Sequence, residues 1–205
     1  MSTLLLALCL LSADPADKPA WQPLLDGKTL EGWKVVEFGG DGKVKVEDGK
    51  VVMKMGNSLT GITYDKKDLP TSNYEIQLEA QRVDGIDFFC GLTFPVKDSH
   101  CSLIVGGWAG AVVGLSRIDD KDASENDTTK YITFKTGQWY QIRLRVTDEN
   151  ISAWIDDKQV IDQDIEGKKI STRNEVDLSK PLGLSAWQTT AAVRNLQIRE
   201  LDKAE

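Results

Sequence analysis

The side chains with the clearest potential for ligand binding fall into two segments, each with a tryptophan. Trp108 lies in the segment GGWAG (residues 106–110), where glycine neighbours leave its indole few side chains to pack against. Trp187 and Gln188 follow a short apolar segment. An indole can stack on the C–H face of a sugar ring, while amide and carboxylate groups hydrogen-bond its hydroxyls. We therefore expect Trp108, Trp187 and Gln188 to bind carbohydrate. The alternative is that the tryptophans are core residues.

A polar stretch between these segments, residues 116–129, could supply acid–base groups. Its acidic and amide side chains are Asp119, Asp120, Asp122, Glu125, Asn126 and Asp127. A long loop within a compact domain is usually functional or disordered, and the alternative here is a solvated acidic loop. We expect Asp122, Glu125 and Asn126 to accompany the two tryptophans.

Metal and nucleophile chemistry have little support in this sequence. His100 is the single histidine, which excludes sites with several histidine ligands. A Ser-His-Asp triad would have to use this one residue, at the tip of an expected hairpin. The carboxylates of residues 116–129 could hold calcium, but their spacing does not match an EF-hand. No metal and no cofactor is predicted, and calcium stays possible without being indicated.

Short β-strands must position these side chains. Apolar and polar residues alternate along residues 74–81, 140–146 and 151–155, as half-buried strands require. Polar turns separate many such segments, which is typical of hairpins. About a dozen short strands predict an all-β fold, a jelly-roll sandwich of two antiparallel sheets. A second charged segment, residues 166–180, also interrupts the series of strands. We expect it to be a surface excursion, a loop exposed to solvent.

Length and charge narrow the class of protein. The 205 residues suffice for one sizeable core, and we expect a single domain over residues 21–205. The net charge of -7 argues against a nucleic-acid partner or an anionic membrane surface.

The N-terminus predicts export. The apolar run at residues 4–11 is too short to span a bilayer but fits a secretory signal. We expect a signal peptide at residues 1–13, a short leader at 14–20, no transmembrane span and a secreted or periplasmic protein. Cys90 and Cys101 then remain. They flank an expected hairpin around residues 95–100, so they could form a disulfide or stay as two buried thiols.

Several longer segments resemble one known family. These are WQPLLDGKTLEGWK (residues 21–34), GQWYQIR (137–143), AWIDDKQV (153–160) and VRNLQIREL (193–201). They are similar to the opening, the later hairpin and the closing strand of the 3-keto-disaccharide hydrolase family, whose domains are also described as 3-keto-glucoside lyases or hydratases. The resemblance covers nearly all of residues 21–205, and the opening segment is its most specific part.

The resemblance implies a concanavalin-like fold, export and action on oxidised glycosides. A ketone at sugar carbon 3 acidifies the hydrogen at carbon 2, so a base can remove that proton and the substituent at carbon 1 leaves. Glu125 or Asp122 is the expected base, with His100 behind them, and Arg117 would steady the enolate oxygen. The family's Glu-containing strand corresponds to residues 101–105 here, which hold no carboxylate and indicate a divergent subgroup.

Three functions remain open on the sequence. The first is an exported enzyme that cleaves 3-keto-glycosides by elimination or hydrolysis. The second is a non-catalytic carbohydrate-binding module of the same fold, which the missing strand carboxylate favours. The third is a structural or adhesive surface domain. For the first two, the partner is a small oligosaccharide or glycoside.

Overall fold

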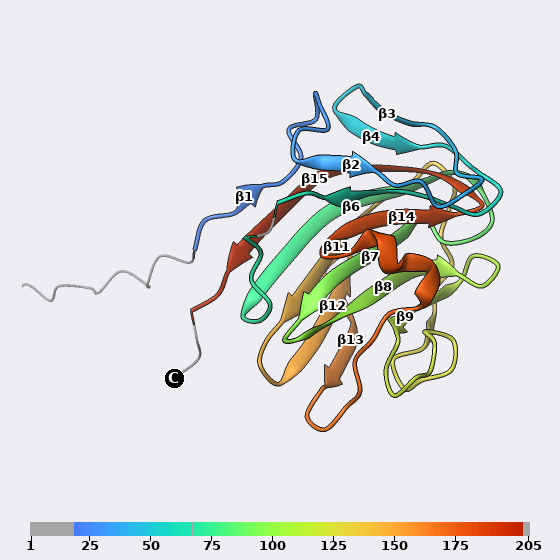
Figure 1. Cartoon of the computed structure of the whole chain (residues 1–205). Helices are drawn as coiled ribbons and strands as arrows, with labels where there is room; N and C mark the ends of the chain where they lie inside the picture. The colour runs from blue at the N-terminus through green and yellow to red at the C-terminus, as the bar shows by residue number, and fades with distance from the viewer. Residues whose placement is uncertain (1–18, 67, 203–205) are drawn as a thin grey trace, which may run out of the picture.

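The computed structural model describes residues 19–66 and 68–202. The predicted signal peptide and residues 14–18 of the predicted leader lie outside the described residues. Over the described residues the chain forms two antiparallel β-sheets packed face to face, which confirms the predicted all-β jelly-roll sandwich (Figure 1). No helix among these residues is long and apolar enough to cross a membrane.

One sheet has eight strands within the described part of the chain, in the order β13-β12-β11-β6-β15-β4-β3, with β1 paired to β15. Its strands are β1 (Gln22–Pro23), β3 (Val44–Glu47), β4 (Lys50–Met53), β6 (Tyr74–Gly85), β11 (Trp139–Val146), β12 (Asn150–Ile155), β13 (Lys158–Asp164) and β15 (Thr189–Glu200). The alternating segments predicted as strands therefore form β6, β11 and β12.

The other sheet has seven strands over the same residues, in the order β10-β9-β8-β7-β14-β5-β2. Its strands are β2 (Trp33–Val35), β5 (Leu59–Tyr64), β7 (Cys90–Val96), β8 (Ser99–Gly107), β9 (Val112–Ser116), β10 (Lys130–Tyr131) and β14 (Gly183–Trp187). A short 3₁₀ helix, η1 (Asn174–Ser179), packs against β5 and β14. It is the orange-red coil in Figure 1.

The core lies between the two sheets and follows the period of two along each strand. On β6, Ile76, Leu78 and Ala80 are at most 1% exposed and face the core. The residues between them face outward, because successive side chains of a strand point to opposite faces. One of these, Glu75, is nevertheless fully buried.

Arginines bury Glu75 on the outer face of the eight-stranded sheet. Its carboxylate accepts hydrogen bonds from Arg143 at 3.0 Å, from Arg145 at 2.8 Å and from Arg199. Burial opposes the charge most strongly, but the hydrogen bonds and charges of Arg199 and Arg145 prevail and lower the pKa of Glu75. The guanidinium of Arg143 also lies 3.8 Å from the ring centre of Trp154. Around Glu75, this face is therefore covered by its own ion pairs.

The outer face of the seven-stranded sheet is different, because small side chains leave it open. Gly91, Ser102, Gly114, Ser116 and Ser185 alternate there with core residues on β7, β8, β9 and β14. Two connections lie over this face: η1 and the stretch of residues 117–129, whose Ala123 packs on Ile104 and Val112. The small residues thus create the floor of a site, and the connections create its walls.

Of the two alternatives for Cys90 and Cys101, the disulfide is wrong and the pair of buried thiols is found, for a reason that lies in the strand register. The predicted hairpin forms, with a turn at residues 97–98, so that Phe94 lies opposite Cys101 and Cys90 lies opposite Val105. The four-residue offset separates the cysteines by about 14 Å along the strands, whereas a disulfide requires Cα atoms within about 7 Å. Both cysteines are free and buried, and burial raises the pKa of each thiol to about 12.

Candidate functional site

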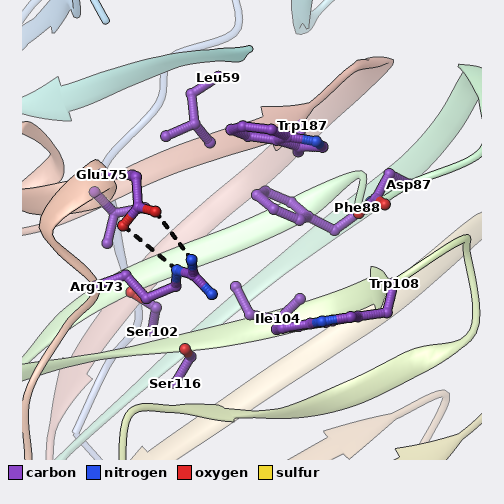
Figure 2. A pocket seen from close by; sticks show the side chains of 11 residues that line it. Leu59, Asp87, Phe88, Ser102, Ile104, Trp108, Ser116, Arg173, Glu175 and Trp187 are labelled. Carbon is purple, nitrogen blue, oxygen red and sulfur yellow. Dashed lines mark hydrogen bonds and ion pairs between the residues drawn. The ribbon is translucent and has the colours of Figure 1, made fainter. Parts of the chain in front are cut away.

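A cleft of about 280 Å³ opens on the outer face of the seven-stranded sheet (Figure 2). Its lining is mainly apolar, with a few polar groups at one end and along the floor. The apolar residues are Leu59, Phe88, Ile104, Trp108, Val176 and Trp187, and the polar residues are Asp87, Ser102, Ser116, Arg173 and Glu175. This composition is typical of a small-molecule site, in which apolar walls bury the ligand and a few polar groups orient it.

Three aromatic side chains form one wall of the cleft. Trp187 ends β14, Phe88 precedes β7, and Trp108 follows β8. The backbone N–H of Trp187 donates to the carbonyl of Phe88 at 3.1 Å, which joins two of the three positions. Figure 2 shows the Phe88 ring drawn between the two indoles. The arrangement presents broad apolar ring faces to the cleft, suited to the C–H face of a sugar.

Asp87 ties this aromatic wall together. Its carboxylate accepts the N–H of Phe88 at 2.8 Å and the N–H of Ala109 at 3.2 Å. The second contact holds a turn in which Trp108 and Ala109 both have positive φ, at 48° and 65°. Positive φ at both central residues is the geometry of a tight type I′ turn, which the N–H of Gly110 closes on the carbonyl of Gly107 at 3.1 Å. The turn therefore fixes the backbone of Trp108, and the indole, 41% exposed, lies outside the core.

Arg82 supports the same loops from below. Its side chain is buried, and its guanidinium donates to the carbonyls of Asp87, Gly106 and Gly110 at 3.0–3.2 Å. The guanidinium also lies 5.2 Å from the ring centre of Phe89. A single cation thus fixes the backbone before Phe88 and on both sides of Trp108. This geometry makes the aromatic wall pre-organised.

The polar end of the cleft is an ion-pair network centred on Arg173. Its Nη2 donates to Oε1 of Glu175 at 2.9 Å, and its Nη1 donates to Oδ2 of Asp122 at 2.5 Å. The hydrogen bond from Arg173 lowers the pKa of Glu175, and the same contact raises the pKa of Arg173. Both groups are therefore ionised at neutral pH. Of the five N–H donors of a guanidinium, these carboxylates use three, and the other two have no partner among the residues that the structure describes, so they could bind a ligand.

Hydroxyl groups form the floor between the two ends. Ser102 on β8 lies directly opposite Ser116 on β9, and the Ser102 hydroxyl is 2.9 Å from that of Thr93. Ile104 follows on the same face of β8. The strand that lacks a carboxylate in the sequence therefore presents a hydroxyl and an aliphatic side chain to the cleft.

The structure brings some of the predicted residues together. Trp108 and Trp187 line the same cleft, although 78 positions separate them in the sequence. Asp122 does not line the cleft but supports it, through its contacts with Arg173 and, at 3.5 Å, with Nε of Arg117. Glu125 is exposed, and its charge contributes to raising the pKa of Arg173.

The other predicted residues lie outside the cleft lining. Arg117 donates to the carbonyl of Asp120, and Gln188 donates to the carbonyl of Asn57 at 3.0 Å. Asn126 donates to the carbonyls of three residues of its own loop and of β9, at 2.8–3.1 Å. These side chains hold connections in place.

His100 lies on the cleft face of β8, two residues before Ser102 and hence about 7 Å along the strand. Partial burial, followed by the charge of Lys180, lowers the pKa of His100, while Asp177 opposes the shift. The imidazole is therefore neutral at pH 7. It is not among the residues that line the cleft.

The sequence did not reveal Arg173, Glu175 or Phe88 as site residues. The first two belong to residues 166–180, which were expected to be a surface excursion, and this expectation is wrong for the part that closes the cleft. A charged segment looks the same in sequence whether it faces solvent or a ligand. In the pair Phe88-Phe89, period-two alternation predicts only that one ring faces outward.

No cluster of three or more metal-binding side chains is found among the described residues. Three of the five carboxylates considered for calcium pair with cations. Asp119 contacts Lys168 at 3.0 Å, Asp120 contacts Lys169 at 2.8 Å, and Asp122 contacts Arg173.

The two sheets and the cleft define a class, the jelly-roll domains. Three solved structures are similar in fold: carbohydrate-binding module CBM66 from Bacillus subtilis (13% identity, TM-score 0.56, covering 82% of this chain and 96% of that chain), a putative glycosyl hydrolase from Parabacteroides distasonis (15%, 0.53, 89% and 94%), and domain 4 of the arabinanase AbnA from Geobacillus stearothermophilus, in complex with arabinotriose (16%, 0.57, 93% and 96%). At these identities the likeness establishes the fold alone.

Residues 20–199 match the family of 3-keto-alpha-glucoside-1,2-lyase-like domains, and the chain belongs to this family. The family resemblance inferred from the sequence is thereby confirmed. No functionally curated protein matches the chain.

Proposed function

We propose that this protein is a carbohydrate-active domain that cleaves 3-keto-glycosides in the cleft of the seven-stranded sheet. The observation that carries the proposal is the shared cleft of the aromatic wall and the Arg173–Glu175 ion pair. The family match supports the substrate class, and the fold of the similar structures is compatible with it.

Binding follows from the two ends of the cleft. The apolar face of a sugar ring stacks on Trp187, Phe88 or Trp108, and the hydroxyls reach Ser102 and the free N–H groups of Arg173. The aromatic wall is fixed by Asp87 and by the buried guanidinium below it, so little ordering is required when the ligand binds.

In the proposed reaction, a base and a cation of the cleft act on the same sugar ring. Glu175 accepts the proton from carbon 2 of a 3-keto-glycoside, and the electron pair moves toward the ketone oxygen, which Arg173 stabilises. The electron pair then forms the double bond between carbons 1 and 2, and the bond from carbon 1 to the leaving oxygen breaks. The leaving oxygen takes up a proton. Asp122 orients Arg173. Glu125, close to Arg173, and neutral His100 are further candidates for the base.

A non-catalytic carbohydrate-binding module is the second candidate, and one observation favours it. β8 presents Ser102 and Ile104 to the cleft with no carboxylate, and the carboxylate of Glu175 is engaged by Arg173. Its lowered pKa makes Glu175 a weaker base. A protein with this cleft could bind a glycan and leave it intact.

Turnover of a 3-keto-glucoside and of 3-keto-trehalose, measured as released sugar with and without EDTA, separates the two functions. The proposal predicts release by the wild-type protein and loss of release in Glu175→Gln, with binding retained. Glu166→Gln is the matched control, since Glu166 is an exposed glutamate of the same connection. Parallel assays of Glu125→Gln, Asp122→Asn and His100→Gln test the other candidate groups.

Binding of unoxidised glycans without any turnover would establish the module and refute the enzyme. Absence of both binding and turnover would favour a structural or adhesive domain. In the EDTA arm, a loss of turnover that Ca²⁺ restores would show that a divalent metal takes part.

We also propose that the protein is exported, because residues 4–11 form an apolar run typical of a signal peptide. N-terminal sequencing of the protein recovered from the periplasm or medium should begin close to residue 14. Recovery of the full-length chain from the cytosol alone would contradict export.

A further inference from the structure

An exposed tyrosine lies beyond the cleft, on the edge of the same sheet. Tyr131 on β10 is 75% exposed, the highest value among the exposed large hydrophobic side chains of the described residues. β10 is the edge strand next to β9, and neither the fold nor the cleft uses the Tyr131 ring. Exposed aromatic rings with a polar tip are common where a protein meets an amphipathic ligand.

The strand register places Tyr131 on the face that carries the cleft. Tyr131 lies opposite Val112, and Val112 lies opposite Gly107, the residue before Trp108. Directly paired residues project to the same side of a sheet. Val112 packs with Ile104 and Phe88, both of which line the cleft. The side chain of Tyr131 therefore extends the row of apolar residues that crosses the sheet.

The residues between the cleft and Tyr131 are well packed and hydrogen-bonded. Val112 is buried under Ala123 of residues 117–129, so it supports the surface between the cleft and Tyr131 without being exposed on it. The N–H of Ile132 donates to the carbonyl of Ala111 at 2.8 Å, which fixes β10 beside the Trp108 loop. The backbone that carries Tyr131 is thus fixed beside the cleft.

The row is too long for a single sugar ring. Four inter-strand steps separate β14, which carries Trp187, from β10, and each step is about 4.8 Å, so the row spans about 19 Å. A linear oligosaccharide can cover this distance across the strands. The polar tip of the Tyr131 ring suits a sugar hydroxyl better than it suits an apolar protein partner.

We propose that Tyr131 is the platform of an outer subsite, and that the natural ligand is an oligosaccharide whose terminal ring lies in the cleft and whose distal ring stacks on Tyr131. This inference rests on the proposed function, because it extends the ligand of the same cleft. It adds a specificity for chain length that the cleft alone does not provide.

The test is calorimetric titration with malto-, cello- and laminari-oligosaccharides from disaccharide to hexasaccharide, unoxidised and oxidised at carbon 3 of the terminal ring. The wild-type affinity should rise with length. Tyr131→Ala should lower the affinity for the longest ligand by about 3- to 10-fold, as expected for one aromatic contact, and leave the disaccharide unchanged. Tyr131→Phe should retain the length dependence, since it keeps the ring.

Val35→Ala is the control, because Val35 is an exposed apolar residue on β2, at the opposite edge of the same sheet. Equal effects of Tyr131→Ala on short and long ligands, or no effect, would overturn the outer subsite. Trp187→Ala separates the two proposals. If it weakens the binding of short and long ligands while Tyr131→Ala has no effect, the cleft is right and the subsite is wrong. If no saccharide binds the wild-type protein, both proposals fail.

Discussion

Replacing Trp187 with alanine is expected to remove a sugar-binding surface while leaving a folded protein. The indole is half-buried at the end of β14, and its backbone contact with Phe88 does not depend on the side chain. Replacing a completely buried tryptophan with alanine lowers the free energy of unfolding by about 3–5 kcal/mol. For the half-buried Trp187 we expect a loss of about 2 kcal/mol. For a chain of this length, that lowers the melting temperature by about 4–8 °C.

The expected effect on binding is of similar size. Stacking of a planar nucleobase on an aromatic side chain contributes about 1–3 kcal/mol. A sugar offers only its C–H face, so we take the lower part of that range, about 1–2 kcal/mol, equivalent to about 5- to 30-fold in the dissociation constant. Isothermal titration calorimetry on the oligosaccharide that the wild-type protein binds best would measure it.

Trp154→Ala is the matched control for this prediction. Trp154 is also half-buried but lies on the outer face of the other sheet, against Arg143. It should lose a comparable amount of stability and no affinity. If both variants bind sugar as the wild type does, or if both lose affinity equally, the assignment of the cleft is refuted.

Three further predictions concern the stability of the fold, the reactivity of the two cysteines and the floor of the site. Glu75→Gln should lower the free energy of unfolding by about 3 kcal/mol at neutral pH, because buried arginine contacts are lost. The folded-state pKa of Glu75 is lowered from 4.5, so this difference in stability should be constant above that pH and shrink as the pH falls below it. Denaturant titrations at several pH values measure it, and a difference that grows in acid would contradict the predicted direction. Thiol titration should find Cys90 and Cys101 unreactive in the native protein and both free after denaturation without reductant, whereas loss of either thiol would point to a disulfide. Gly91→Ala would place a Cβ 2.9 Å from the Phe88 ring, so it should weaken sugar binding and cost about 1–3 kcal/mol of stability; unchanged affinity would show that this ring does not contact the ligand.

The sequence predicted the strands because their signal is local. Alternation of apolar and polar residues along residues 74–81 directly indicates the two faces of β6. The turn residues indicate where one strand ends and the next begins. Trp108 was identifiable for a similar reason, because an indole among glycines has nothing local to pack against. Two of the three rings of the aromatic wall, Trp108 and Trp187, were within reach of sequence reasoning.

The remaining features depend on long-range pairing. The contact between Arg173 and Asp122 joins positions 51 apart, and no pattern within residues 166–180 distinguishes it from a solvated ion pair. The disulfide prediction was wrong because a hairpin fixes which residues face each other, and here the turn at residues 97–98 leaves Cys90 opposite Val105. Sequence spacing placed the cysteines on adjacent strands but did not determine the register.

The indole N–H resonances of the six tryptophans test the central claim most directly. In a two-dimensional ¹H–¹⁵N spectrum, titration with the bound oligosaccharide should shift the signals of Trp108 and Trp187. The four other signals, from Trp21, Trp33, Trp139 and Trp154, should stay in place. Shifts confined to the tryptophans outside the cleft would contradict the account, because the sugar would then lie elsewhere on the molecule.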